Sequence, residues 1–206
     1  MIPNIVHQTW KTLIFDYWVF SRSQDSVRKH LGHWAYRFWT DADLSTLLID
    51  QFPDIYTSWC ALDKHIKRID IARYCILYIH GGLYADLDFI FTRAIDEIID
   101  DKYQIFSYIS TQAIIKGWDF MGNAMLMSQP RQSFWLDAIR YMFSLPGDTD
   151  VLDHTGPRAL GKFFRLYGTH HAINVFGPEY FDNDRCADGV GEHRYGYHMR
   201  AATWQR

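Results

Sequence analysis

Asp86 and Asp88 are the residues whose type and spacing most readily support chemistry. The Asp-x-Asp pattern occurs four times in the chain, so its surroundings must distinguish one pair from another. Asp41 and Asp43 follow Thr40, a good helix N-cap, and carboxylates are favourable in a first helical turn. We interpret that pair as structural. The remaining pairs lie in turn-like, polar stretches and carry no functional prediction, at 148/150 and 182/184.

Apolar residues surround Asp86 and Asp88, in the segment Gly81-Gly-Leu-Tyr-Ala-Asp-Leu-Asp-Phe-Ile90. This pattern predicts a buried strand, in which residues two apart point to the same side. Two buried like charges are costly unless a cation or hydrogen-bond donors compensate them. Because carboxylate oxygens suit a hard divalent ion, we predict a metal or catalytic site. A structural pairing with Arg or Lys is the alternative.

The elements that must position this pair follow from periodicity. Apolar residues at helical spacing predict a helix over 63–80, which ends at Gly81-Gly82, and a strand over 83–91. We also expect strands at 2–9, 34–39 and 174–176, and helices at 40–50, 133–143 and 158–167, with Pro53 ending the helix after Thr40. Alternating strands and helices predict an α/β fold with a central sheet flanked by helices.

Asp70 and Arg73 precede the acidic pair on the long helix. They are three residues apart and share a helix face. Because that helix runs into the acidic strand, a charged pair facing the same pocket could hold hydroxyls and phosphate. The alternative is a surface salt bridge, which contributes little to stability.

Both ends of the chain offer further candidates. Trp10 ends the first predicted strand, where it could stack on a nucleobase or belong to the core. In the tail, His198 and Thr203 could complete a metal shell, or the tail could dock through Trp204. The Gly-rich segment 182–196 is expected to be mobile, and its ordering would bring the tail over a bound donor.

Composition excludes several classes of protein. The chain has 206 residues, 48% hydrophobic and 17% aromatic, which fits one domain with a substantial core. A net charge of −3 gives no basis for nucleic-acid binding. We find no signal peptide and no apolar run that could cross a bilayer, and three cysteines without metal spacing. We therefore expect a cytoplasmic location rather than the Golgi lumen, and the chain could be one module of a longer protein.

Four ordered motifs resemble the glycosyltransferases with a "sugar-binding region containing DXD motif", family 32. They are His7-Gln-Thr-Trp-Lys11, Trp39-Thr-Asp41, Asp70-Ile-Ala-Arg-Tyr74 and Gly81-Gly-Leu-Tyr-Ala-Asp-Leu-Asp88. That family includes initiating α-1,6-mannosyltransferases and bacterial capsule and lipopolysaccharide enzymes. The Asp-x-x-Arg and Asp-x-Asp motifs also resemble the glucosyltransferase domain of large clostridial toxins. In the tail, Tyr197-His198 and Ala202-Thr-Trp204 depart from the His-His and Gly-Ser-Trp of many relatives, which leaves the third metal ligand open.

The resemblance implies a GT-A fold, a Rossmann-like nucleotide-binding sandwich around one mixed sheet. Residues 1–110 would bind the nucleotide sugar, and 111–206 would form the acceptor part and closing tail. Mn²⁺ or Mg²⁺ would bridge the donor phosphates. The implied donor contacts are Thr9, Trp10 on the base, Asp70 and Arg73 on ribose or sugar, Asp86 on hydroxyls, and Trp204; the implied metal ligands are Asp88, His198 and Thr203.

We therefore expect a metal-dependent hexosyltransferase that moves a sugar from a nucleotide-sugar donor to a glycan or other hydroxyl acceptor. UDP is preferred over GDP from the toxin-like motif, and the family implies retention of anomeric configuration. Two alternatives remain at this point. One is a metal-dependent phosphohydrolase or nucleotidase, which also needs clustered carboxylates. The other is a non-catalytic sugar-binding module.

Overall fold

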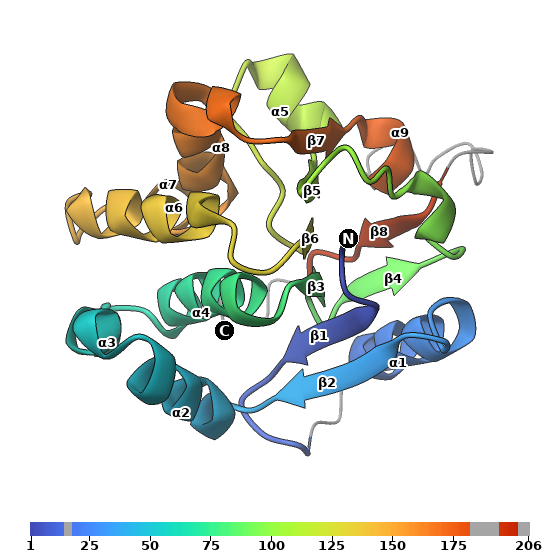
Figure 1. Cartoon of the computed structure of the whole chain (residues 1–206), viewed down its shortest axis with the longest axis horizontal. Helices are drawn as coiled ribbons and strands as arrows, with labels where there is room; N and C mark the ends of the chain where they lie inside the picture. Colours follow the sequence, from blue (N-terminus) through green and yellow to red (C-terminus); the bar gives the residue numbers. More distant parts are fainter. Residues whose placement is uncertain (15–17, 182–193, 202–206) are drawn as a thin grey trace.

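The computed structural model describes residues 1–14, 18–181 and 194–201. Most of the segment 182–196 that we expected to be mobile, together with Thr203 and Trp204, lies outside these ranges. The described chain is built on a six-stranded mixed sheet that runs from bottom to top of Figure 1 in the order β2-β1-β3-β6-β5-β7. The strands are β1 (Ile5–Thr9), β2 (Ala35–Trp39), β3 (Gly82–Ala85), β5 (Ile105–Tyr108), β6 (Met125–Ser128) and β7 (Ile173–Phe176).

Helices cover one face of this sheet (Figure 1): α2 (Asp41–Gln51), α3 (Pro53–Cys60), α4 (His65–His80), α6 (Ser133–Ser144), α7 (Val151–His154) and α8 (Pro157–Tyr167). On the other face lie α1 (Trp18–His30), α9 (Pro178–Phe181) and a two-stranded antiparallel sheet of β4 (Phe89–Phe91) and β8 (Gly196–His198). Each face of the sheet has its own hydrophobic core, because successive side chains of a strand point to opposite faces. Tyr84 packs in the core that contains α4, while Leu83 and Ala85 pack in the core that contains β4. The predicted α/β class with a mixed central sheet is confirmed.

Most long elements agree with the sequence patterns, and the differences have local causes. The Thr40 side chain accepts a hydrogen bond from the Asp43 backbone N–H, and the Asp43 carboxylate accepts one from the Thr40 N–H, so this pair caps α2 as expected. Pro53 was expected only to end that helix, yet it also opens α3, since proline is favourable at a first helical position. We did not predict β5, β6 or the short α5 (Thr111–Lys116), whose four- to six-residue patterns carry little periodicity.

Gly81 and Gly82 connect α4 directly to β3. Both residues have positive φ, 64° and 86°, which side chains disfavour. A Cβ on Gly82 would lie 2.5 Å from Ile5 Cγ2, so glycine also allows β3 to approach β1. The helix ends at these glycines as expected, and Gly81, with ψ −153°, lies outside the left-handed helical region.

The predicted single strand over 83–91 is wrong. The chain breaks between β3 and β4, which belong to different sheets, and Asp86 and Asp88 lie in the turn between them. The Asp86 N–H donates to Ala124 O at 2.8 Å, and the Asp86 carbonyl accepts from Phe89 N at 2.9 Å. The first bond extends the β3–β6 pairing by one residue and the second closes a turn, so the two carboxylates are not placed by strand alternation.

One edge of the sheet gathers many chain ends. β6 runs antiparallel to its neighbours β3 and β5, so its first residue lies at the edge where β1, β3 and β5 end. The helices that follow the strands on this side begin at the same edge. Ligands of open α/β sheets bind at such an edge, outside the carboxyl ends of the strands.

Candidate active site

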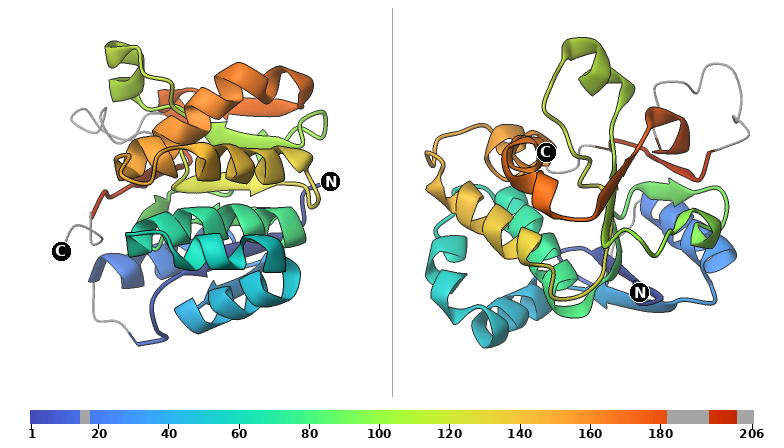
Figure 2. Two further views of the ribbon diagram at one scale, coloured as in Figure 1. Left: turned by 90° about the vertical axis from the view of Figure 1, so that its left-hand side faces the viewer. Right: turned by 45° about the horizontal axis from the view of Figure 1, so that its top comes forward.

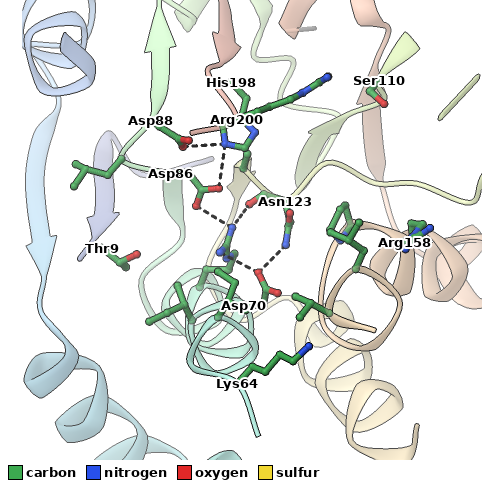
Figure 3. A pocket seen from close by; sticks show the side chains of 18 of the residues that line it. Thr9, Lys64, Asp70, Asp86, Asp88, Ser110, Asn123, Arg158, His198 and Arg200 are labelled. Carbon is green, nitrogen blue, oxygen red and sulfur yellow. Dashed lines mark hydrogen bonds and ion pairs between the residues drawn. The ribbon is translucent and has the colours of Figure 1, made fainter. Parts of the chain in front are cut away.

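A cavity of about 990 Å³ lies at this edge. Its size is at the upper end of the roughly 300–1,000 Å³ typical of ligand pockets. Its walls come from the end of β1, the start of α4, the β3–β4 turn, the residues before β6 and the start of α8. Figure 3 shows Asp86, Asp88 and His198 gathered on one side of the cavity, with Lys64 and Arg158 farther away.

Asp86, Asp88 and His198 form a cluster in which one ligand atom from each lies within 4.8 Å of the others. His198 Nε2 lies 2.9 Å from Asp88 Oδ1 and 3.8 Å from Asp86 Oδ2. The antiparallel register of β4 and β8 sets Phe89 opposite His198, which carries the histidine to the turn. Asp88 Oδ2 accepts from the Ala201 N–H at 2.8 Å. The structure thus brings the tail histidine beside both aspartates, and its role as a metal ligand stays a prediction.

The charges of this cluster are coupled. Burial lowers the pKa of His198, but the Asp88 carboxylate and its hydrogen bond outweigh this, and the net pKa is raised. Burial opposes the charge of Asp88, while His198 lowers its pKa below the ordinary value. The pKa of Asp86 is raised, mainly by burial. Positive charge between the two carboxylates is therefore favourable, and a divalent cation is one way to supply it.

Arg73 joins Asp70 to Asp86. Its guanidinium lies 2.9 Å from Asp70 Oδ1 and 3.0 Å from Asp86 Oδ1, and it donates to Asn123 O at 2.7 Å. The Asp70 and Arg73 side chains are only 4% and 3% exposed, so the alternative of a surface salt bridge is wrong. Arg73 also lies over the Tyr84 ring, 4.8 Å from its centroid. The helix thus holds the Asp86 carboxylate in place.

Asp70 is anchored from three directions. Besides Arg73, it accepts hydrogen bonds from Asn123 Nδ2 and Thr155 Oγ1, each at 2.9 Å. Burial raises the pKa of Asp70 to about 7, although Arg73 and these two donors favour its charged form. Direct contact between Asp70 or Arg73 and a donor sugar stays a prediction, and both residues line the cavity.

Tyr84 completes the support of Asp86. Its hydroxyl donates to Asp86 Oδ1 at 2.9 Å and lies 3.1 Å from Thr9 Oγ1. Asp86 Oδ1 is thus engaged by Tyr84 and Arg73, while Oδ2 lies toward His198. We did not predict this role of Tyr84. Its position two residues before Asp86, at the end of a buried strand, was the available signal.

Trp10 lies at the end of β1 and lines the cavity, as expected from the sequence. It is half-buried and packs edge-on against Phe20, with ring centroids 4.5 Å apart. Lys11 Nζ lies 5.8 Å from the centre of the Trp10 ring. The ring therefore combines partial core packing with exposure to the cavity, and stacking on a base stays a prediction.

The far end of the cavity is cationic and aromatic, which the sequence did not indicate. The Trp118 ring has Lys116 Nζ 4.6 Å from its centroid and the Arg158 guanidinium 5.2 Å away. Arg158 is also paired with Asp150 at 3.2 Å and Asp153 at 2.9 Å. Asp150 additionally caps α7 by accepting a hydrogen bond from the Leu152 N–H, a role that we did not predict. These residues come from different elements, and only the fold brings them together.

Residues 16–105, which include Asp70, Arg73, Asp86 and Asp88, match the model described as "Glycosyltransferase sugar-binding region containing DXD motif". The segment that carries these motifs therefore has the signature of this family. Inositol phosphoceramide mannosyltransferase 3 of Schizosaccharomyces pombe is 36% identical to it over 99 residues, covering 48% of this chain and 27% of the relative.

A second relative is a mannosyl phosphorylinositol ceramide synthase of Saccharomyces cerevisiae. It is 30% identical over 174 residues, which cover 81% of this chain and 43% of the relative. The chain therefore spans less than half of the length of these two fungal proteins. Among the described residues of this chain, no helix is long and apolar enough to span a membrane.

The fold is that of GT-A glycosyltransferases. The solved structure of the PaToxG glycosyltransferase superimposes with a TM-score of 0.60 at 15% identity, covering 80% of this chain and 69% of that one. At this identity the likeness concerns the fold alone. It confirms the GT-A architecture that the motifs implied.

Proposed function

We propose that this chain is a metal-dependent glycosyltransferase that moves a hexose from a nucleotide-sugar donor to a hydroxyl acceptor. The observation that carries the proposal is the cluster of Asp86, Asp88 and His198 at the ligand-binding edge of a GT-A sheet. Within one catalytic unit, residues 1–110 would bind the donor and residues 111–206 the acceptor. The family match over residues 16–105 favours this proposal over the two alternatives, a phosphohydrolase and a sugar-binding module.

The donor set of the cluster fits Mn²⁺. Two carboxylates suit Mg²⁺ or Mn²⁺, while an imidazole ligand is commoner with transition ions. Asp88, His198 and the Oδ2 atom of Asp86 would hold the ion, which departs from our expectation that Asp86 binds only hydroxyls. When bound, the ion supplies Lewis-acid stabilisation of the leaving diphosphate. Thr203, predicted as a further ligand, lies outside the described residues.

The surrounding residues have separate tasks in the proposal. Trp10 stacks on the base, and Thr9 lies beside it at the end of β1. Arg73, anchored by Asp70, fixes the orientation of Asp86 and adds positive charge near the departing phosphate. Trp204, a further predicted donor contact, lies outside the described residues. Front-face attack, with the leaving phosphate accepting the acceptor proton, accounts for the retention that the family implies.

The relatives bear on which sugar and acceptor are used. Two are named as transferring mannose to an inositol-phosphate ceramide lipid. We therefore propose nucleotide-activated mannose as the first donor to test, beside the UDP-sugars favoured by the toxin-like motif. Lys64 and Lys116 line the cavity. These cations suit an acceptor that carries a phosphate group next to its hydroxyl.

The test is a donor and acceptor panel. GDP-mannose, UDP-glucose and UDP-N-acetylglucosamine are incubated with the protein and Mn²⁺, with and without an inositol phosphate or a methyl mannoside, and with and without a chelator. Metal-dependent formation of a glycosylated acceptor is expected. Nucleotide release that no acceptor accelerates would instead indicate a hydrolase. Failure of every nucleotide to raise the melting temperature would indicate a sugar-binding module.

A further inference from the structure

Two short segments near the cavity carry grouped, exposed apolar side chains, while a third such pair, Leu166 and Tyr167, lies at the end of α8. In the connection between β1 and α1, Leu13 is 73% exposed and Ile14 is 89% exposed. On α5, Ile114 is 54% exposed and Ile115 is 70% exposed. Single exposed apolar residues are normal, but grouped ones mark an interaction site. Each group also has an exposed tryptophan nearby, Trp18 in the first and Trp118 in the second.

Both segments border the mouth of the same cavity. Trp10 and Lys11, just before Leu13, line the cavity, and so do Lys116 and Trp118, just after Ile115. The two segments stand on opposite sides of it, because one follows β1 and the other follows β5 in the strand order of the sheet. In the left view of Figure 2, residues 10–14 and α5 both lie toward the left-hand side, one below and one above.

Each segment pairs its aromatic rings with a cation. Lys116 lies over Trp118, and Arg22 lies over Trp18 with 5.6 Å between the guanidinium and the ring centroid. Exposed aliphatic side chains beside a tryptophan and a basic residue have the composition of a membrane-interface site. The aliphatic groups enter the acyl boundary, the rings lie at headgroup level, and the cations meet lipid phosphates.

We propose that the exposed side chains of Leu13, Ile14 and Trp18, together with residues 114–118, dock the chain on an anionic lipid bilayer, with the mouth of the cavity facing the headgroups. The two groups are small and lie apart on either side of an opening, so a rigid protein partner would have to bridge the cavity mouth. A fluid bilayer can accommodate both groups at once. The docking goes beyond the proposed function, and rests on it only in explaining why a phosphate-bearing lipid acceptor would be reached directly.

The experiment compares vesicle binding of matched variants in sedimentation assays without any donor. The wild-type chain is expected to bind vesicles of phosphatidylcholine with phosphatidylserine more tightly than vesicles of phosphatidylcholine alone. Ile114→Asp with Ile115→Asp, and separately Leu13→Asp with Ile14→Asp, should each weaken binding by about tenfold or more, since 1.4 kcal/mol corresponds to tenfold. None of these four residues lines the cavity.

Ile49→Asp and Leu166→Asp are matched controls. Both residues are 50% exposed, and both lie near the far ends of helices that begin at the cavity edge, α2 and α8. Their vesicle binding should equal that of the wild type. The proposal is overturned if the wild type binds no vesicles, or if the two double variants bind vesicles as tightly as the wild type. It is also overturned if those changes abolish a dimer in sedimentation velocity while vesicle binding persists.

The outcome is separable from that of the proposed function. Nucleotide affinity, measured by calorimetry, should be the same for the docking variants and the wild type. A chain that binds anionic vesicles but transfers no sugar would refute the proposed function and leave the docking intact. A chain that glycosylates a water-soluble acceptor but does not bind vesicles would refute the docking and leave the proposed function intact.

Discussion

His198 Nε2 lies 2.9 Å from Asp88 Oδ1, although 110 residues separate the two in the chain. The contact follows from the β4–β8 pairing, which sets Phe89 opposite His198 and adds a Met199 N–H bond to Asp88 O at 2.9 Å. Asp88 and its partners are therefore ordered by backbone pairing rather than by side-chain packing alone. The geometry is suited to holding a cation whose ligands must not rearrange.

Asp88→Asn and His198→Ala are each expected to weaken Mn²⁺ binding by about tenfold or more, since even residues that only support a ligand contribute about that much. Calorimetric titration of the chain with Mn²⁺, without donor, measures this. Asp43→Asn is the matched control, because it changes an aspartate of a capping Asp-x-Asp pair and should leave the affinity unaltered. Full sugar transfer after exhaustive chelation would contradict the metal site.

Trp10→Ala is expected to weaken nucleotide binding by roughly 1–3 kcal/mol, the magnitude of one lost base–aromatic stack. Nucleotide affinity measured by calorimetry on the folded variant tests this. Trp18→Ala provides the control, since Trp18 is 63% exposed and does not line the cavity. If both variants bind the nucleotide as the wild type does, Trp10 belongs to the packing around Phe20 and not to the donor site.

Arg73→Lys is expected to lower turnover, because lysine cannot bridge Asp70 and Asp86 as the guanidinium does. Burial of the network adds a stability loss of roughly 1–3 kcal/mol. Turnover and urea unfolding are measured on the same preparations. Arg165→Lys, in an exposed pair with Asp119, should change stability by less than about 1 kcal/mol. Unchanged turnover in a destabilised Arg73→Lys variant would mean that the network is structural only.

His7 should make the stability of the chain depend on pH. Burial, with His80 nearby, lowers the pKa of His7 to about 3, and its neutral ring accepts from Trp39 Nε1 and donates to Gly81 O. Between pH 3 and the ordinary value of 6.5 the unfolded chain therefore binds the proton and the folded chain does not. The His7 contribution is fully present above pH 6.5 and is lost as pH falls toward 3, by up to about 1.4 kcal/mol per pH unit.

The measurement for His7 is the free energy of unfolding against pH in urea. His7→Gln removes the titrating group while retaining a donor and an acceptor, so the slope between pH 3 and 6.5 should be shallower than in the wild type. Parallel curves for the two proteins would mean that His7 is not the residue that titrates. His33→Gln, an exposed histidine paired with Asp96, serves for comparison.

The sequence predicted the elements with strong periodicity and the residues with unusual surroundings. α4 and its Asp70 and Arg73 were found because apolar residues recur at helical spacing around them. The convergence of Asp86 and Asp88 was predicted correctly from a wrong premise, since a turn and not a strand brings them together. Local patterns could not indicate that Asn123 and Thr155 hold Asp70, because those contacts span 53 and 85 residues.

The late position of β8 has a consequence for the order in which the protein is made. Translation delivers both aspartates of the turn more than a hundred residues before the strand that brings His198. Until that strand pairs with β4, a growing chain has two of the three groups of the cluster and lacks the imidazole. A polypeptide whose synthesis ends before residue 196 would therefore contain the Asp86 and Asp88 motif but lack the assembled cluster.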